Sequence, residues 1–508
     1  MNPPASPAAV AQDIAKALEG ARAMHHAGRS SEAERVCRRI LALRPGHFVA
    51  LNLLGMICAA THRLDEAVRC FRAAGRINPK AALVHNNEGS ALAMLGQHEA
   101  ALDCFERAAT LEPAYAEAFN NRGNSLAALN RHGEAIAAYD RAITLKPDYA
   151  EAFNNRGVAL RELDRPDAAL DDYARALRAR PDYTDAQMNE GLARLALGDL
   201  EAGLPKFEYR WQATLRAARR SFPQPLWLGD AEVAGRTILL HAEQGFGDTL
   251  QFCRYAPLVA ALGAKVLLEV PRELVRLLSR MPHVRTVAAG EPLPDFDLHC
   301  PLMSLPLAFG TTLATIPAEV PYLDAEPGLI ASWRQRLAVL PGKRVGLTWA
   351  GGARPHQFHA QALDRRRSIG LAGFAGLATL PGLVLVSLQK GPPAAEARAP
   401  PSGMVMHDWT DALEDFADTA ALIMALDLVI CVDTAVAHLA GALGKPVWVL
   451  NRFDQCWRWL RGRHDSPWYP SARLFRQPVP GDWDSVMREV VTGLRDLCTA
   501  GPTASTSS

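Results

Sequence analysis

Proline recurs every 34 residues in the first part of this chain, as Pro45, Pro79, Pro113, Pro147 and Pro181. Two other residue types keep the same step. Glycine does so at Gly55, Gly89, Gly123, Gly157 and Gly191, and an aromatic residue at Phe71, Phe105, Tyr139, Tyr173 and Phe207. A fixed period of this length indicates one helix–turn–helix unit per repeat. Because one unit cannot bury its apolar face alone, the units must stack into a superhelix with a long concave surface.

The pattern resembles the tetratricopeptide repeat. In each repeat we expect the glycine of the first helix to admit the second helix closely, and the aromatic residue to fill the space between neighbouring repeats. Proline should end the second helix. Between the two helices, positions 28, 62, 96, 130, 164 and 198 are mostly Gly, Asn or Asp, which tolerate the left-handed conformation that ends a helix. We expect a repeat domain over residues 11–215.

Asparagine is the periodic residue that stacking does not explain. Four of them stand two residues before a repeat glycine: Asn87, Asn121, Asn155 and Asn189. Because asparagine lowers helix propensity, its recurrence on one face predicts amides that bind the backbone of an extended peptide. Hydrogen bonding between repeats is the alternative. With this ladder the arm resembles the repeat domain of the protein O-GlcNAc transferases, which implies a protein or peptide acceptor in the groove. Leu53 breaks the correspondence.

Composition excludes several classes of protein. At 508 residues the chain is too long for one core. A net charge of +1 gives no reason to expect nucleic acid as a partner. The nine cysteines form no C-x-x-C pair, which argues for a reducing compartment and against a zinc site. Without a visible signal peptide or an apolar run of about 18 residues, we expect no membrane span and a cytoplasmic protein. The small, polar tail at 499–508 is predicted to be disordered.

The second part of the chain alternates buried strands with helical segments. After a linker at 216–235, short strands are predicted within 236–242, 265–270, 343–350, 382–388 and 427–450. This alternation favours parallel sheets covered by helices on both faces. We therefore predict an α-solenoid followed by an α/β module of two Rossmann-like subdomains. The subdomains are expected at 236–325 on the acceptor side and at 326–498 on the nucleotide-sugar side, with a cleft between them.

The clearest chemical motif runs from Asp433 to Gly441, where a strand leads into a helix that opens with Asp-Thr. A helix N-terminus at the carboxyl end of a parallel strand is where α/β proteins place phosphates. His438 lies one turn into that helix. The alternative interpretation is a capped helix with a buried histidine.

A second motif, Gly245-Phe246-Gly247-Asp248, follows the first strand. Its glycines allow a close backbone approach, and Asp248 is either a functional carboxylate or only an N-cap. The motif does not match the dinucleotide-binding fingerprint, which argues against a dehydrogenase. Three further candidates are Gly351 after a strand, Arg367 in an arginine run, and Lys390 at a strand end.

Together these motifs resemble glycosyltransferase family 9, the ADP-heptose:lipopolysaccharide heptosyltransferases, whose fold is called GT-B. The resemblance implies a donor diphosphate held by Asp433, Thr434, Ala435 and His438, a catalytic aspartate at Asp248, and a phosphate-contacting basic residue at Arg367. Heptosyltransferases lack a long repeat arm, so the whole chain is closer to bacterial repeat-containing glycosyltransferases, some of which modify flagellin or other proteins.

These observations predict an inverting, nucleotide-sugar-dependent glycosyltransferase that modifies a protein Ser or Thr hydroxyl bound by the repeats. Asp248 would be the general base, and Arg367 and His438 would neutralise the leaving nucleotide. No D-x-D pair stands in a plausible metal position, so we expect neither metal nor cofactor. Two alternatives remain open. One is a non-catalytic repeat scaffold with a degenerate nucleotide-sugar fold, and the other is a heptosyltransferase-like enzyme acting on a glycan or lipid carrier.

Overall fold

The computed structural model describes residues 7–352, 364–454 and 456–499. Apart from its first residue, the tail predicted to be disordered lies outside these ranges. The chain divides into two compact units between Ala186 and Gln187.

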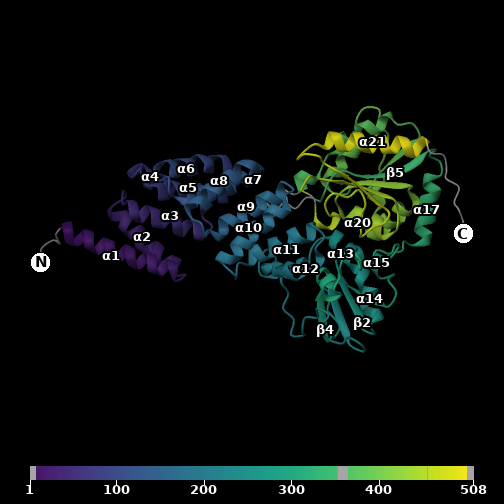
Figure 1. Cartoon of the computed structure of the whole chain (residues 1–508), viewed down its shortest axis with the longest axis horizontal. Coiled ribbons are helices and arrows are strands. Elements are labelled where there is room, and N and C mark those ends of the chain that lie inside the picture. The colour runs from purple at the N-terminus through teal and green to yellow at the C-terminus, as the bar shows by residue number, and fades with distance from the viewer. Residues whose placement is uncertain (1–6, 353–363, 455, 500–508) are drawn as a thin grey trace. The chain divides into compact units, whose positions relative to one another are not determined.

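The first unit is a helical solenoid, as expected (Figure 1). Its helices are α1 (Pro7–His26), α2 (Ser30–Leu43), α3 (Phe48–Ala60), α4 (Leu64–Ile77), α5 (Ala82–Met94), α6 (His98–Leu111), α7 (Ala116–Ala128), α8 (His132–Leu145), α9 (Ala150–Glu162) and α10 (Pro166–Ala179). Each repeat proline follows the end of a second helix by two residues. The division between the units falls inside α11 (Thr184–Ala196).

The periodic residues have the geometry that the repeat requires. A Cβ atom added to Gly89 would lie 2.7 Å from the ring of Phe105, and one added to Gly157 would lie 2.6 Å from the ring of Tyr173. Each ring thus covers the glycine of its own repeat, whereas we had expected it to fill the space between neighbouring repeats. The expected left-handed turns are confirmed, with a positive φ at Gly28, His62, Gly96, Asn130, Asp164 and Gly198.

The second unit contains two parallel sheets, which confirms the predicted α/β region. The first sheet has the order β3-β2-β1-β4, with β1 (Thr237–His241), β2 (Lys265–Val270), β3 (Val284–Ala288) and β4 (Leu298–Pro301). Its helices are α13 (Phe246–Phe252), α14 (Ala256–Ala261), α15 (Arg272–Leu278) and α16 (Leu305–Ala308).

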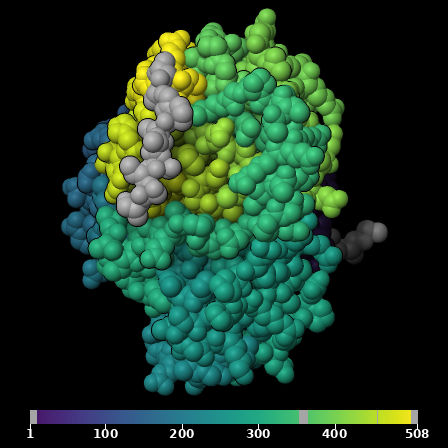
Figure 2. Space-filling view, turned by 90° about the vertical axis from the view of Figure 1, so that its right-hand side faces the viewer, coloured from purple at the N-terminus to yellow at the C-terminus, as the bar shows by residue number. Residues whose placement is uncertain are grey.

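The second sheet has the order β10-β9-β8-β5-β6-β7. Its strands are β5 (Lys343–Thr348), β6 (Leu383–Ser387), β7 (Met406–His407), β8 (Leu428–Val432), β9 (Val447–Asn451) and β10 (Ala472–Arg476). Around it lie α17 (Pro327–Leu337), α19 (Phe416–Ala425), α20 (Ala435–Ala442) and α21 (Trp483–Thr499). Figure 2 shows the part of the second unit that holds the first sheet in teal, and the part that holds the second sheet in green to yellow.

Short 3₁₀ helices complete the second unit. They are η1 (Glu208–Trp211), η2 (Arg216–Ala218), η3 (Cys253–Tyr255), η4 (Leu302–Ser304), η5 (Leu371–Thr379), η6 (Pro392–Arg398), η7 (Thr410–Ala412) and η8 (Trp457–Trp459).

The second helix of the last repeat packs into the apolar core of the second unit. Leu200, Leu204 and Phe207 of α12 (Leu200–Phe207) belong to the same buried apolar cluster as Ile238 and Leu240 of β1. Sequence periodicity placed the end of the repeat arm at residue 215, whereas packing divides the chain at residue 186. The period continues through α12, but the core that α12 joins is that of the α/β unit.

Candidate active site

The motif at 245–248 lies at the start of α13, and the motif at 433–441 lies at the start of α20. The two helices are neighbours in the structure (Figure 1). These helices begin just beyond the carboxyl ends of β1 and β8. A Cβ atom added to Gly247 would lie 2.9 Å from Cδ2 of His438 and 3.5 Å from Cα of Ala435. The absence of a side chain at Gly247 therefore lets the first turns of the two helices touch, and this contact brings Asp248 into the neighbourhood of the Asp433–His438 segment.

Asp248 combines both of the roles considered for it. Its Oδ2 accepts a hydrogen bond from the backbone N–H of Gly245 at 3.0 Å, which caps α13. Its Oδ1 accepts from Nη2 of Arg458, and the carboxylate side chain is 22% exposed. The Arg458 guanidinium lies over the rings of Phe252 and Trp457. Sequence reasoning missed Arg458, because no spacing or motif joins it to Asp248.

His438 is a buried and neutral imidazole. Its Nδ1 lies 3.0 Å from the hydroxyl of Tyr469, and its ring stacks on Trp459 with centroids 5.3 Å apart. Burial lowers the pKa of His438 to about 4, although the Asp433 carboxylate opposes the shift. At neutral pH burial therefore favours the neutral imidazole, which carries one N–H group.

Arg367 and Gly351 lie against each other beside the end of β8. Nη1 of Arg367 donates to the carbonyl of Asp433 at 3.1 Å, and Nη2 pairs with Asp364 at 2.7 Å. A Cβ atom on Gly351 would lie 2.3 Å from Nε of Arg367, so a larger residue there would displace this guanidinium. The N–H of Gly351 donates to Ser368 Oγ at 3.1 Å, which ties the residues directly after β5 to Ser368.

Three polar atoms near these strand ends are buried and have no hydrogen-bond partner among the described residues. They are Oγ1 of Thr434, Nε of Arg367 and Nδ2 of Asn451. Thr434 is the N-cap residue of α20, yet its side chain caps nothing. Because a buried polar atom without a partner costs free energy, this group favours a polar ligand or ordered water at the N-terminus of α20.

The remaining predicted residues divide between two places. Ala435 is the first residue of α20 and lies against Gly247. Lys390 instead donates from Nζ to the carbonyls of Thr410 and Leu413, both at 2.8 Å. The structure therefore ties its ammonium group to a neighbouring loop rather than to Arg367 or Thr434. In the described part of the chain, no group of three His, Cys, Asp or Glu side chains could hold a metal ion.

The asparagine ladder of the first unit makes the hydrogen bonds between repeats that were the open alternative. Three of the four amides donate to an asparagine 35 residues earlier, at 3.1, 3.0 and 3.1 Å: Asn87 to Asn52, Asn121 to Asn86, and Asn155 to Asn120. Asn189 is buried in the second unit. Peptide binding by the ladder remains a prediction.

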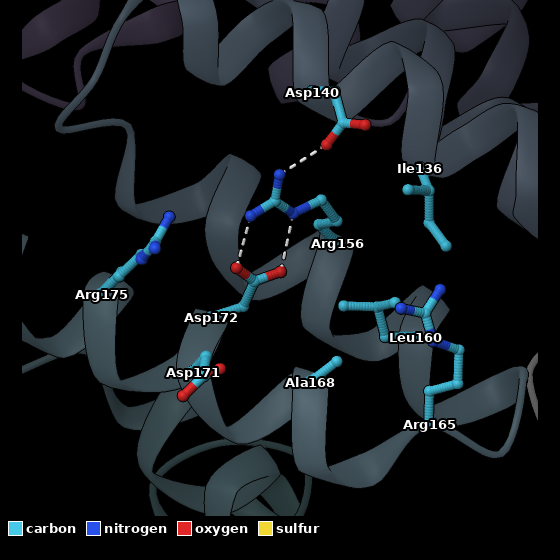
Figure 3. Close-up of a pocket in the computed structure, with 9 residues that line it drawn as sticks. All are labelled: Ile136, Asp140, Arg156, Leu160, Arg165, Ala168, Asp171, Asp172 and Arg175. Carbon is cyan, nitrogen blue, oxygen red and sulfur yellow. Dashed lines mark hydrogen bonds and ion pairs between the residues drawn. The ribbon is translucent and has the colours of Figure 1, made fainter.

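The first unit also has a charged hollow of about 370 Å³ between α8, α9 and α10 (Figure 3). At its centre Arg156 donates to Asp172 at 2.7 and 2.5 Å and to Asp140 at 2.5 Å. Arg165 and Arg175 lie at its edges. The central arginine is fully engaged with carboxylates, so it serves to hold successive repeats together.

Comparison with known families agrees with both units. Tetratricopeptide repeat families match residues 18–82, 89–164 and 150–183. The glycosyltransferase family 9 (heptosyltransferase) profile matches residues 414–452, which span α19, β8, α20 and β9. The chain thus joins residues that match tetratricopeptide repeats to a segment that matches the glycosyltransferase family 9 profile. That segment includes Asp433, Thr434 and His438, whereas Asp248 and Arg367 lie outside it. No helix in the described ranges is long and apolar enough to span a bilayer.

Protein FlbA of Caulobacter vibrioides (strain ATCC 19089 / CIP 103742 / CB 15) is 31% identical over 333 residues. The match covers 60% of this chain and 54% of FlbA, so the chain spans about half the length of this relative. Among solved structures, MamA is 24% identical, with 32% of this chain and 94% of MamA covered and a TM-score of 0.30. YrrB, a repeat protein with an unusual peptide-binding site, is 24% identical, with 34% and 88% covered and a TM-score of 0.29.

Proposed function

We propose that this chain is an inverting glycosyltransferase that moves a sugar from a nucleotide-sugar onto a Ser or Thr hydroxyl of a protein held by its repeats. The observation that carries the proposal is the pair of orphaned buried polar atoms on Thr434 and Arg367. They lie at the N-terminus of α20, inside or beside the family 9 match, where α20 touches the helix that carries Asp248.

The donor diphosphate fits the chemistry of this helix end. The positive end of the α20 dipole favours an anion, and Thr434 Oγ1 and Arg367 Nε are free to donate to phosphate oxygens. The neutral imidazole of His438 donates one N–H, and the backbone of Ala435 offers another. Arg367 supplies the positive charge that the leaving nucleoside diphosphate needs. The proposal includes no metal ion or other cofactor, and it gives Asp433 and Gly351 the role of positioning the Arg367 guanidinium beside them.

Asp248 would act as the general base. The acceptor oxygen attacks the anomeric carbon from the face opposite the phosphate, and its proton passes to a free lone pair of the Asp248 carboxylate. The bond between the anomeric carbon and the phosphate oxygen breaks, and the nucleoside diphosphate leaves with that electron pair. Attack and departure on opposite faces invert the anomeric centre. Arg458 and the N–H of Gly245 hold the carboxylate in one orientation.

The repeats would present the acceptor. Tetratricopeptide solenoids expose a concave surface suited to an extended chain. An asparagine amide has two N–H donors and an oxygen with two lone pairs, and Asn87 and Asn121 each donate once to the neighbouring repeat, so the ladder has hydrogen-bonding capacity for a peptide. We therefore propose that this capacity is used to bind peptide backbone by the four residues Asn87, Asn121, Asn155 and Asn189.

The test is nucleotide release from a panel of UDP-, GDP-, ADP- and dTDP-sugars, with and without EDTA, followed by ³¹P NMR. We expect one sugar nucleotide to be hydrolysed slowly without a metal. Thr434→Val keeps the shape but removes the orphaned hydroxyl, so affinity for that nucleotide should fall by about 10-fold or more, as for loss of a hydrogen bond to a charged group. Thr286→Val, which removes another buried threonine hydroxyl without a hydrogen-bond partner but on β3, is the matched control.

Three outcomes would contradict the proposal. Failure to bind any nucleotide, or equal affinity in Thr434→Val, would reject the donor site. Binding without turnover, even with a protein acceptor, would favour the non-catalytic scaffold. Transfer to a glycan or lipid carrier but not to protein would favour the heptosyltransferase-like alternative.

A further inference from the structure

The residues that follow the last repeat helix reach the loop that precedes Asp248. Arg210 of η1 is 1% exposed. Its Nε and Nη2 donate to the two carboxylate oxygens of Glu243, both at 3.0 Å. Glu243, only 2% exposed, lies in the short loop between β1 and α13, five residues before Asp248. A planar, two-point contact of this kind fixes the position and the direction of the carboxylate.

A chain of contacts continues from this pair to the candidate base. Glu243 Oε1 also accepts from the backbone N–H of Met303 at 3.0 Å. The sulfur of Met303 lies 3.9 Å from Nη2 of Arg458, and that nitrogen donates to Asp248. Arg210 thus supports both the loop that leads into α13 and the residue that packs against the partner of Asp248.

A second route runs through aromatic rings. The ring of Phe207, the last residue of α12, lies 6.2 Å from the ring of Trp457, which precedes Arg458. The Arg210 guanidinium lies 4.6 Å above the same Phe207 ring. The two groups that hydrogen-bond to Asp248 are the N–H of Gly245 and the guanidinium of Arg458. Both belong to segments that contact residues 207–210.

The charges explain why Arg210 cannot be lost without a local change. Glu208 and Ser304 complete its shell, with contacts of 2.5 Å to Glu208 and 2.7 Å to Ser304. Burial raises the pKa of Glu243, and the Arg210 guanidinium opposes that shift. Without Arg210 the buried Glu243 carboxylate would face the partly exposed Glu208 carboxylate, and a buried uncompensated charge is far more costly than the intact pair. The 242–245 loop would have to move to reach water.

We propose that Arg210 is a positioning residue for Asp248, so that the last repeat is a working part of the active site. This inference rests on the proposed function, because it assigns Asp248 to catalysis. It assigns residues 207–210 to the catalytic part, although the sequence placed them within the repeat arm.

The test uses the full chain with Arg210→Met, Arg210→Lys and a matched control, Arg156→Met. Arg156 is also a repeat arginine that is engaged with two carboxylates, but it lies in the hollow of the first unit (Figure 3). Hydrogen exchange of peptides covering 242–252 should be at least about 10-fold faster in Arg210→Met than in wild type. The increase should be smaller in Arg210→Lys, and Arg156→Met should exchange at the wild-type rate. Equal exchange in wild type and both Arg210 variants would overturn the inference.

The second readout separates positioning from general stability. With the sugar nucleotide that the wild type hydrolyses, kcat of Arg210→Lys should fall by about 10- to 100-fold while KM for the donor stays unchanged. A rise in KM with kcat preserved would overturn the positioning role. If Arg210→Met unfolds the second unit, Arg210→Lys alone decides. If the wild type hydrolyses no sugar nucleotide, the proposed function fails, whereas loop exchange still decides whether Arg210 holds the 242–252 segment.

Discussion

Gly247 sits where two helices touch, and adding a single methyl group there tests the geometry of the site directly. In Gly247→Ala the new Cβ would meet Cδ2 of His438 at 2.9 Å, about 0.5 Å closer than ordinary van der Waals contact. His438 cannot retreat easily, because its ring stacks on Trp459 and its Nδ1 bonds to Tyr469. The two helix ends must therefore separate.

Overpacking of this kind costs about 1–3 kcal/mol. Gly245→Ala is the control, because it changes the other glycine of the same turn. Its Cβ would meet only Asp248 Oδ2 at 3.5 Å, and its φ of −78° suits alanine. We expect Gly245→Ala to stay within about 0.5 kcal/mol of wild type, as surface substitutions usually do.

Urea unfolding followed by tryptophan fluorescence measures the difference. All ten tryptophans lie at or beyond residue 211, so the signal reports on the second unit alone in the intact chain. Turnover should fall by about 10-fold or more as well, because Asp248 moves with α13. Equal stability and equal turnover in Gly247→Ala and Gly245→Ala would refute the contact between α13 and α20.

Four further outcomes are expected. Asp248→Asn keeps the size of the side chain but cannot take a proton, so turnover should drop by roughly 10²–10⁴ with donor affinity near wild type, and surviving activity would leave Asp248 as a cap only. As pH falls from 6.5 toward 4, His438 takes up a proton in the unfolded state but stays neutral in the folded state, because burial lowers its pKa to about 4. The free energy of unfolding, followed by fluorescence, should therefore fall by about 2–3 kcal/mol more in wild type than in His438→Gln. Residues 187–508 should retain nucleotide binding whereas 221–508 should not fold stably, and a stable 221–508 chain in circular dichroism would contradict the shared core. The last variant changes four residues to alanine: Asn87, Asn121, Asn155 and Asn189. It should leave the solenoid helical but weaken acceptor binding more than tenfold. Lower stability with unchanged acceptor affinity would reduce the ladder to a structural role.

Local signals predicted much of the fold. The buried runs that became β1, β5, β8 and β9 could be recognised because the strands of a parallel sheet are apolar on both faces. The turns of the repeats could be recognised because Gly, Asn and Asp favour positive φ, and even His62 adopts it in the same place. Such features depend on a few neighbouring residues, so a single sequence reveals them.

Contacts between distant segments could not be predicted. Arg458 and Asp248 are 210 residues apart, and no sequence pattern contains both of them. Periodicity also left the partner of each ring ambiguous: Phe71 follows Gly55 by 16 residues and precedes Gly89 by 18, so the period alone does not say which glycine it covers. The neutral state of His438 likewise depends on burial by Trp459 and Tyr469, which the motif does not contain.

The last repeat shows how a periodic position can change its partner without changing its residue type. Gly191 and Phe207 keep the 34-residue step, but the atoms nearest a Cβ on Gly191 belong to Lys206 and to the backbone of Phe207, not to its ring. The α12 helix is short and contains Pro205, and the Phe207 ring contacts Trp457 instead. An aromatic ring that closes a repeat elsewhere here joins the core of the α/β unit. The period therefore identifies the repeat, whereas the end of the solenoid is set by the core into which its last ring packs.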